Sequence, residues 1–199
     1  MDLMDALASN RNGQSVVELS LNRAFRQGYR SVYAAIDALT PRVKPVLEEV
    51  ERIRQEERLQ AVVGSVLPEP AAHWVFAVDG LSLSRPHAAT LHDRGYVHWT
   101  EGSSGGPPVT VGHGYSLVAA LPAKAGAGEA PWAVPVSTRR VGTHTDALTV
   151  ACEQMETLLG NETAAWQGQL AVLVADSGYG VAPFLGRLAE EAKLVTVTR

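Results

Sequence analysis

The sequence is poor in the features that mark membrane or secreted proteins. Its 199 residues include one cysteine, Cys152, so the chain cannot form an internal disulfide, which suits a reducing compartment. No apolar run reaches the roughly 18 residues that a membrane-spanning helix needs. Residues 1–5 are acidic at two positions and lack the basic-then-apolar order of a signal peptide. We therefore expect a cytoplasmic protein without membrane contact, in which Cys152 packs as a small residue on a helix.

Positive charge is also scarce. The chain has 17 lysines and arginines against 21 aspartates and glutamates, which gives a net charge of -4. A free-standing nucleic-acid-binding protein is usually basic, so any basic surface on this chain has to be local. The 46% apolar and 19% charged content is typical of a globular protein of one domain, or of one domain plus a helical extension.

The common nucleotide-binding and zinc motifs are missing or incomplete. No G-x-x-x-x-G-K-[ST] occurs, and the glycines from Gly178 to Gly186 do not complete G-x-G-x-x-G. A nucleotide- or methyl-donor-dependent enzyme built on Gly178 and Gly180 stays open as a weaker alternative. The six histidines show no H-x-x-x-H spacing, and one cysteine is too few for a thiolate-rich zinc site.

Two apolar runs each end in an aspartate followed by turn-forming residues. Val75–Val78 precedes Asp79, and Leu170–Ala175 precedes Asp176. A short apolar run bounded by turn residues predicts a strand buried on both faces. A carboxylate at the end of such a strand lies where a parallel sheet opens to ligands, and two of them side by side suit a divalent metal in phosphoryl chemistry. The alternative for each aspartate is a cap of the next turn or helix.

The first 70 residues have helical patterning. Apolar positions recur at helical spacing over residues 15–39, although Gly28 weakens that prediction. Thr40 and Pro41 predict the start of a second helix, whose mixed charges favour a solvated face over a DNA- or partner-contacting one. We therefore expect an N-terminal helical region over residues 1–70.

From residue 71 onward the pattern changes to strands. We expect strands over 75–78, 96–101 and 109–121, a short strand or extended segment over 132–137, a helix over 143–161, a strand over 170–175, a helix over 181–192 and a strand over 194–197, with loops over 102–108 and 123–131. Three consecutive strands predict an antiparallel meander, and the later strand–helix–strand predicts a right-handed parallel unit. This order predicts an α/β fold, a ribonuclease-H-like mixed sheet with flanking helices, over residues 71–199.

Several segments, in order, resemble bacterial insertion-sequence transposases with a DDE catalytic centre. Residues 77–86 and 92–94 resemble the segment around the first catalytic aspartate, and residues 172–180 resemble the segment around the second. Residues 108–116 resemble the "Pro-Val-Thr-x-Gly-His-x-Tyr-Ser" segment of that family. Residues 132–137 and 139–141 resemble the next strand and the basic residues that follow it. The similarity runs from about Trp74 to Arg199. It implies metal-dependent cleavage and strand transfer at transposon ends, that is, DNA transposition.

The resemblance also implies the site. Asp79 and Asp176 would be catalytic residues and ligands of two Mg²⁺ or Mn²⁺ ions. The third ligand of the family is a glutamate on a later helix; Glu190 and Glu191 come too early in the topology to supply it. We therefore expect a truncated or split transposase that lacks the C-terminal part of the fold. The alternative is a non-catalytic remnant that binds DNA or an intact transposase.

Basic residues near these segments are candidates for contacts with DNA. They are Arg85, His87, Arg94, Arg139 and Arg140, because a guanidinium matches the fork of a phosphate. The partners expected from the resemblance are transposon-end DNA and a homo-oligomer or a C-terminal partner segment, in the bacterial nucleoid.

Overall fold

The computed structural model of the chain forms two compact units, Met1–Glu51 and Arg52–Arg199. It describes residues 9, 18, 20–23, 25–26, 28–39, 45–68, 70, 72–98, 109–122 and 132–199. The expected helix start at residues 40 and 41 and the two expected loops lie outside these residues. The domain boundary expected after residue 70 stays a prediction.

The first unit contains helix α3, which spans Tyr29–Leu39. The helix begins directly after Gly28, whose carbonyl accepts a hydrogen bond from the backbone N–H of Ser31 at 2.9 Å. The expected helix over 15–39 is therefore confirmed in its second half, and Gly28 stands at the break because glycine in a helix interior costs about 1 kcal/mol relative to alanine. The next helix, α4, spans Pro45–Val66 and continues into the second unit.

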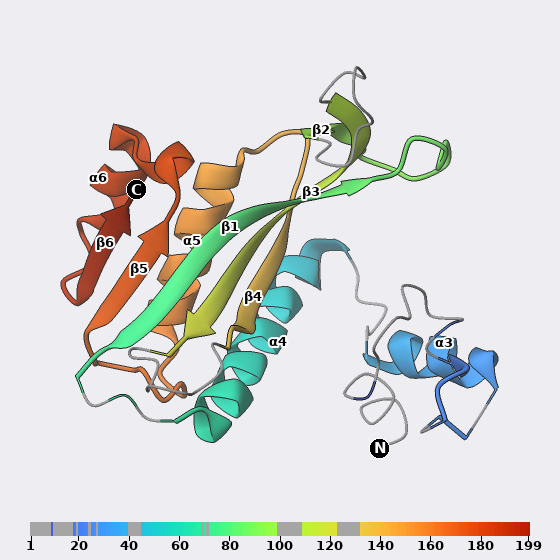
Figure 1. Cartoon of the computed structure of the whole chain (residues 1–199), viewed down its shortest axis with the longest axis horizontal. Coiled ribbons are helices and arrows are strands. Elements are labelled where there is room, and N and C mark those ends of the chain that lie inside the picture. The colour runs from blue at the N-terminus through green and yellow to red at the C-terminus, as the bar shows by residue number, and fades with distance from the viewer. Residues whose placement is uncertain are drawn as a thin grey trace. The chain divides into compact units, whose positions relative to one another are not determined.

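The second unit is built on a six-stranded mixed sheet (Figure 1). Its strands are β1 (Trp74–Ser84), β2 (Gly95–His98), β3 (Val109–Leu121), β4 (Val134–Val141), β5 (Ala171–Ala175) and β6 (Leu194–Thr198). The order across the sheet is β2-β3-β1-β5-β6, and β4 also pairs with β3. Strands β1, β2 and β4 run antiparallel to β3, whereas β5 runs parallel to both β1 and β6.

The expected parallel strand–helix–strand unit is present. The expected antiparallel meander of the first three strands is wrong in its order, because β2 pairs with β3 on the edge opposite β1, and the antiparallel set along the chain is β1, β3 and β4. The short strand or extended segment expected over 132–137 is strand β4, which runs on to Val141, so four strands precede the next helix. Strands β2 and β4 share one edge of β3, since β2 pairs with Val109–Gly112 and β4 pairs with the stretch from Gly114 to Ala120. Figure 1 shows β1 and β3 extending beyond the ends of β5 and β6.

Helix α5 (Ala147–Gly160) follows β4, and α6 (Ala182–Leu188) lies between β5 and β6, preceded by a short 3₁₀ turn, η1 (Ser177–Tyr179). Helix α5 begins four residues later than expected because Asp146 caps it: the Asp146 carboxylate accepts the backbone N–H of Thr149 at 2.9 Å. No helix in the described part of the chain is long and apolar enough to cross a membrane.

The core lies between one face of the sheet and the helices. Its largest fully buried side chains are Trp166, Phe76, Phe184, Met155, Leu158, Leu173 and Leu188. The Trp166 ring meets the rings of Trp74 and Phe76 edge-on, at centroid distances of 5.6 and 5.3 Å. Cys152 on α5 is 2% exposed, which confirms its expected packing role. Each such apolar side chain contributes about 1.5–3 kcal/mol by leaving water.

Helix α4 is attached to this core through polar contacts. The Asn161 side-chain amide donates to the Glu57 carbonyl and to Gln60 Oε1, both at 2.9 Å. The Arg139 guanidinium donates to Glu56 at 2.9 Å from β4. A Cβ at Gly64 would stand 3.1 Å from Ala165, so this glycine lets the helix approach closely. From Arg52 onward, α4 therefore belongs to the compact second unit.

The other face of the sheet carries Asp79. Along the first half of β1 the residues alternate, and Trp74, Phe76 and Val78 point into the core. Asp79 therefore points to the opposite face, which also presents exposed valines from the parallel strands, Val174 and Val197 among them. The expectation of strands buried on both faces is therefore wrong, because the described helices cover only one face of the sheet.

Candidate metal and DNA site

Asp79 and Asp176 lie at the same level of two adjacent parallel strands. The register of β1 on β5 ends with Val78 opposite Ala175. Asp176 directly follows β5, but β1 continues through Asp79 to Ser84, so the strand end expected at Asp79 is wrong. Each aspartate is the next residue after this last pair, on backbones about 4.8 Å apart. Both side chains are exposed. The arrangement places two carboxylates together where the sheet opens to solvent.

One oxygen of each carboxylate is fixed by the main chain. Asp79 Oδ1 accepts the backbone N–H of Gly80 at 2.7 Å, and Asp176 Oδ1 accepts that of Gly178 at 2.9 Å. The second bond makes Asp176 the N-cap of η1, so the capping alternative holds for this residue as well. Within the described residues, Oδ2 of each aspartate accepts no hydrogen bond and is open to a ligand.

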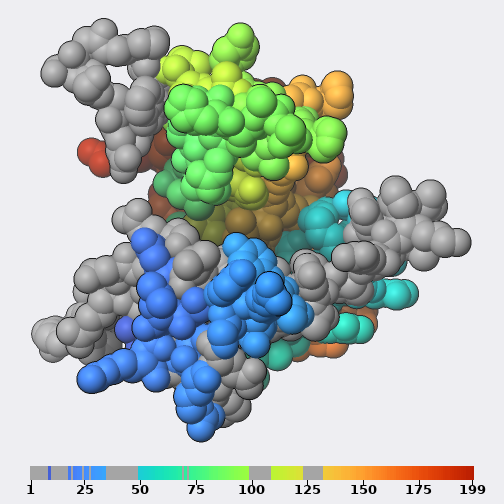
Figure 2. All heavy atoms as spheres, turned by 90° about the vertical axis from the view of Figure 1, so that its right-hand side faces the viewer, coloured from blue at the N-terminus to red at the C-terminus, as the bar shows by residue number. Residues whose placement is uncertain are grey.

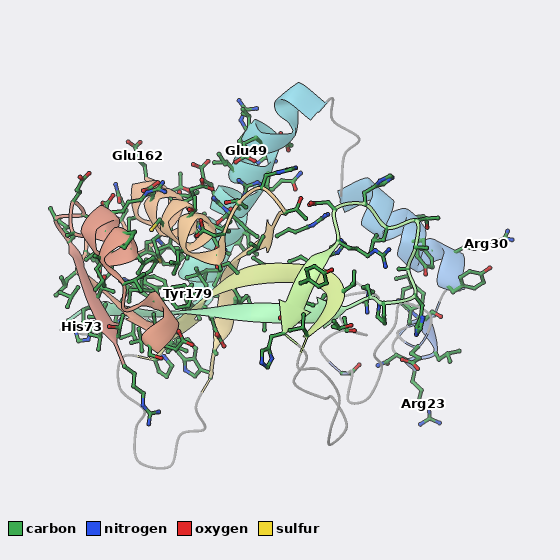
Figure 3. All side chains as sticks on the ribbon, turned by 90° about the horizontal axis from the view of Figure 1, so that it is seen from above. Arg23, Arg30, Glu49, His73, Glu162 and Tyr179 are labelled. Atoms are coloured by element: carbon green, nitrogen blue, oxygen red, sulfur yellow. The ribbon has the colours of Figure 1, made fainter. Side chains whose placement is uncertain are left out.

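Tyr179 lies close to both aspartates. Its side chain is 5% exposed, and its ring meets the Phe184 ring edge-on at 5.2 Å. Figure 3 shows Tyr179 among closely packed side chains, whereas Glu162 projects outward. Burial raises the pKa of the Tyr179 phenol, and the negative charges of Asp79 and Asp176 raise it further. Both carboxylates therefore act on the same buried ring, which agrees with the level that the β1–β5 register gives them.

The donor set suits a hard divalent cation. Mg²⁺ prefers carboxylate oxygens, keeps several waters, and is often bound through one or two carboxylates only. Asp79 and Asp176 fit one such hydrated ion. Among the described residues, no group of three or more acidic, histidine or cysteine side chains could hold a metal, so a complete two-metal ligand set is not formed there.

Glu190 and Glu191 lie at the wrong end of the sheet to complete this set. They follow α6 and precede β6, whose first residue, Leu194, pairs with Ala171 at the start of β5. Asp176 follows the other end of β5, five residues from Ala171, which is about 16 Å of extended strand.

The two neighbouring arginines of β4 point to opposite faces. Arg139 is 5% exposed; its guanidinium donates to Glu56 at 2.9 Å and to Thr157 Oγ1 at 2.8 Å. These bonds give Arg139 a structural role, and we leave it out of the DNA contacts proposed below. Arg140 is exposed and donates to Asp93 Oδ2 at 2.5 Å and to the carbonyl of His92 at 3.1 Å.

The other basic candidates lie in the segment between β1 and β2. Arg85 and His87 are exposed. Arg94 donates to the carbonyls of Arg85 and Pro86 at 2.9 and 3.3 Å and so folds this segment back on itself. Figure 2 shows the end of β1, this segment and β3, in green and yellow-green, gathered on one surface.

Asp93 organises this surface, and sequence reasoning missed it. Its carboxylate accepts the hydroxyl and backbone N–H of Thr143 at 2.6 and 3.1 Å as well as Arg140. These bonds, the Thr143 hydroxyl first, lower the pKa of Asp93 below 3.8. Asp93 has a φ of 55°, a left-handed conformation that aspartate tolerates better than most residues. The available sequence signal was an aspartate followed closely by Gly95, a common turn composition.

Comparison with known proteins agrees with the fold. The family model described as "DDE superfamily endonuclease" matches residues 2–199. No curated protein and no solved structure matches the chain. The six-stranded mixed sheet with its flanking helices is consistent with the ribonuclease-H-like fold of that family. The chain therefore belongs to the DDE superfamily endonucleases, a family of transposase-like nucleases that act on DNA and generally use divalent metals.

Proposed function

We propose that the chain is the catalytic part of an insertion-sequence transposase and that Asp79 and Asp176 bind Mg²⁺ or Mn²⁺ for cleavage and transfer of DNA strands. The observation that supports this most is the register of β1 on β5, which brings the two carboxylates to one level. A bound cation would polarise the scissile phosphate and favour deprotonation of the attacking water or hydroxyl.

The chain's own residues would orient the site. The N–H groups of Gly80 and Gly178 fix one oxygen of each carboxylate and leave the other free to bind. The buried Tyr179 ring forms a rigid wall beside them. Arg85, His87, Arg94 and Arg140 would contact the phosphates of transposon-end DNA, and the reaction would take place at the bacterial nucleoid.

A second candidate function is binding without catalysis, to DNA or to another transposase molecule in a mixed assembly. The observation that favours it is that the described residues do not assemble a third acidic ligand. In the first candidate, that ligand comes from outside the described residues, on this chain or on a partner segment or second copy.

The test of the metal site is thermal unfolding with and without Mn²⁺. Saturation at about 100 times the dissociation constant adds about 2.7 kcal/mol, or roughly 5–10 °C in melting temperature for a protein of this size. We expect the shift in the wild type and in the control Glu190→Gln, and its loss in Asp79→Asn and Asp176→Asn, where an amide replaces the anionic ligand. An equal shift in all four proteins contradicts the site.

Nuclease and binding assays then separate the candidates. Metal-dependent nicking of DNA that is lost in Asp79→Asn supports catalysis. DNA binding that persists without nicking supports the non-catalytic alternative. Stabilisation by a nucleotide or methyl donor instead of Mn²⁺ would favour the weaker enzyme alternative at Gly178 and Gly180.

A further inference from the structure

A groove lies where β2 and β4 share one edge of β3. Its volume is about 440 Å³, and its lining is Gly95, Tyr96, Val97, Gly114, Val141, Gly142, Thr143 and Thr145. Strand β2 pairs with β3 as far as Gly112 and β4 begins its pairing at Gly114, so the groove marks the junction of the two strands. Three of its lining residues are glycines, which leave the backbone accessible to a flat ligand.

An exposed aromatic ring stands at this groove. Tyr96 is 87% exposed, the highest value among the large apolar and aromatic side chains of the described residues. The adjacent Val97 is buried and anchors β2, so the tyrosine is presented from an ordered strand. An aromatic ring on an ordered strand loses little entropy when a flat partner stacks on it.

The groove is built before any ligand arrives. Asp93, two residues before the end of β2 that carries Gly95, bonds both Thr143 in the groove wall and Arg140 on β4. One carboxylate therefore links the segment before β2 to the segment after β4. Residues at the two sides of the groove keep their spacing through this link.

Arginines lie near the groove although the chain is acidic. Over residues 79–98, 109–122 and 132–146 the charged side chains are Arg85, Arg94, Arg139, Arg140 and three acids, Asp79, Asp93 and Asp146, whereas the whole chain has a net charge of -4. Five of the six histidines also fall in these ranges. With Arg139 buried, three arginines remain to attract a phosphate backbone past the groove.

We propose that this groove accepts an unstacked base of the DNA strand, with the base stacked on Tyr96 and its phosphates near Arg94 and Arg140. This inference rests on the proposed function and names the form of the substrate. Asp79 pairs with Leu117, three residues along β3 from Gly114, or about 10 Å. The accepted base therefore lies within a few nucleotides of the phosphate at Asp79.

The experiment measures anisotropy of a fluorescein-labelled oligothymidylate and of a duplex of equal length, without divalent metal. Loss of one stacked base costs about 1–3 kcal/mol, so Tyr96→Ala should weaken single-strand binding roughly 5- to 100-fold and leave duplex binding nearly unchanged. Tyr96→Phe, which keeps the ring, should bind like the wild type. Leu170→Ala, an exposed apolar truncation at the start of β5, is the matched control and should bind normally.

A variant that fills the groove is a second test of base binding. A Cβ at Gly114 would lie 3.6 Å from the Val141 Cβ, which is ordinary contact, so Gly114→Ala should fold and narrow the groove. We expect it to weaken single-strand binding as well. Unchanged single-strand binding in Tyr96→Ala, or equal losses for single strand and duplex, overturns the base pocket while DNA binding stands. A wild type that binds neither DNA overturns the proposed function together with the pocket.

Discussion

Replacing Arg139 by methionine should destabilise the second unit strongly. The change removes the donor to Glu56 Oε2, at 2.9 Å, and leaves that carboxylate 8% exposed on α4 with only Arg52 nearby, at 3.4 Å. The other carboxylate oxygen, Glu56 Oε1, is already buried without a hydrogen bond in the described structure. Truncating one partner of a buried ion pair costs about 3–5 kcal/mol because the remaining charge is buried uncompensated.

The size of the unit sets the thermal effect. For about 150–200 residues each kcal/mol lowers the melting temperature by roughly 2–4 °C, so Arg139→Met should lose roughly 6–20 °C. Urea unfolding followed by tryptophan fluorescence measures the loss of unfolding free energy directly, because Trp166 is 2% exposed and reports on the core. The double variant Glu56→Met/Arg139→Met should recover most of the loss, because replacing both partners by apolar residues is often neutral.

The Arg140→Met variant is the control for Arg139→Met. The ion pair of Arg140 with Asp93 is more than a third exposed on both sides, so Arg140→Met should cost less than about 1 kcal/mol. If Arg139→Met also loses less than about 1 kcal/mol of unfolding free energy and binds DNA more weakly, the structural role of Arg139 is refuted. Arg139 would then be one of the DNA contacts, as predicted from the sequence.

Three further changes test other contacts. A Cβ at Gly112 would stand 2.1 Å from a β1 backbone carbonyl, so Gly112→Ala should cost about 1–3 kcal/mol or more in urea unfolding, whereas Gly114→Ala should cost little. Asn161→Ala leaves buried partners on α4 unbonded and should cost about 1–3 kcal/mol in the same assay. Asp146→Ala should cost about 1 kcal/mol and Asp146→Asn much less, measured by thermal unfolding at neutral pH. The hydrogen bond from the Thr149 N–H lowers the pKa of Asp146. The stabilisation that Asp146 gives is therefore complete above pH 3.8 and is lost as pH falls through the lower pKa of the folded state. If the stability difference between wild type and Asp146→Asn stays the same down to about pH 2, the hydrogen bond is not the cause.

Strong local patterns were enough to predict several of the strands and helices. The apolar runs before Asp79 and Asp176 are strands because nothing in them competes with burial on a sheet, and Val109–Leu121 was predicted with the bounds it has. The order of the elements also fixed the parallel unit, since a strand–helix–strand connection has one favoured hand. Helix ends were less accurate, because caps such as Asp146 act over single residues.

The tertiary structure decided which of these residues meet. Asp79 and Asp176 are 97 positions apart, and only the register of β1 on β5 brings them to one level. Arg139 and Arg140 are the same type of residue and adjacent in sequence. Because side chains alternate along a strand, Arg139 contacts Glu56 in the interior, whereas Arg140 lies at the surface. The groove at Tyr96 exists because two strands share one edge of β3. Pairing and burial of this kind depend on contacts distant in sequence, which local patterns do not encode.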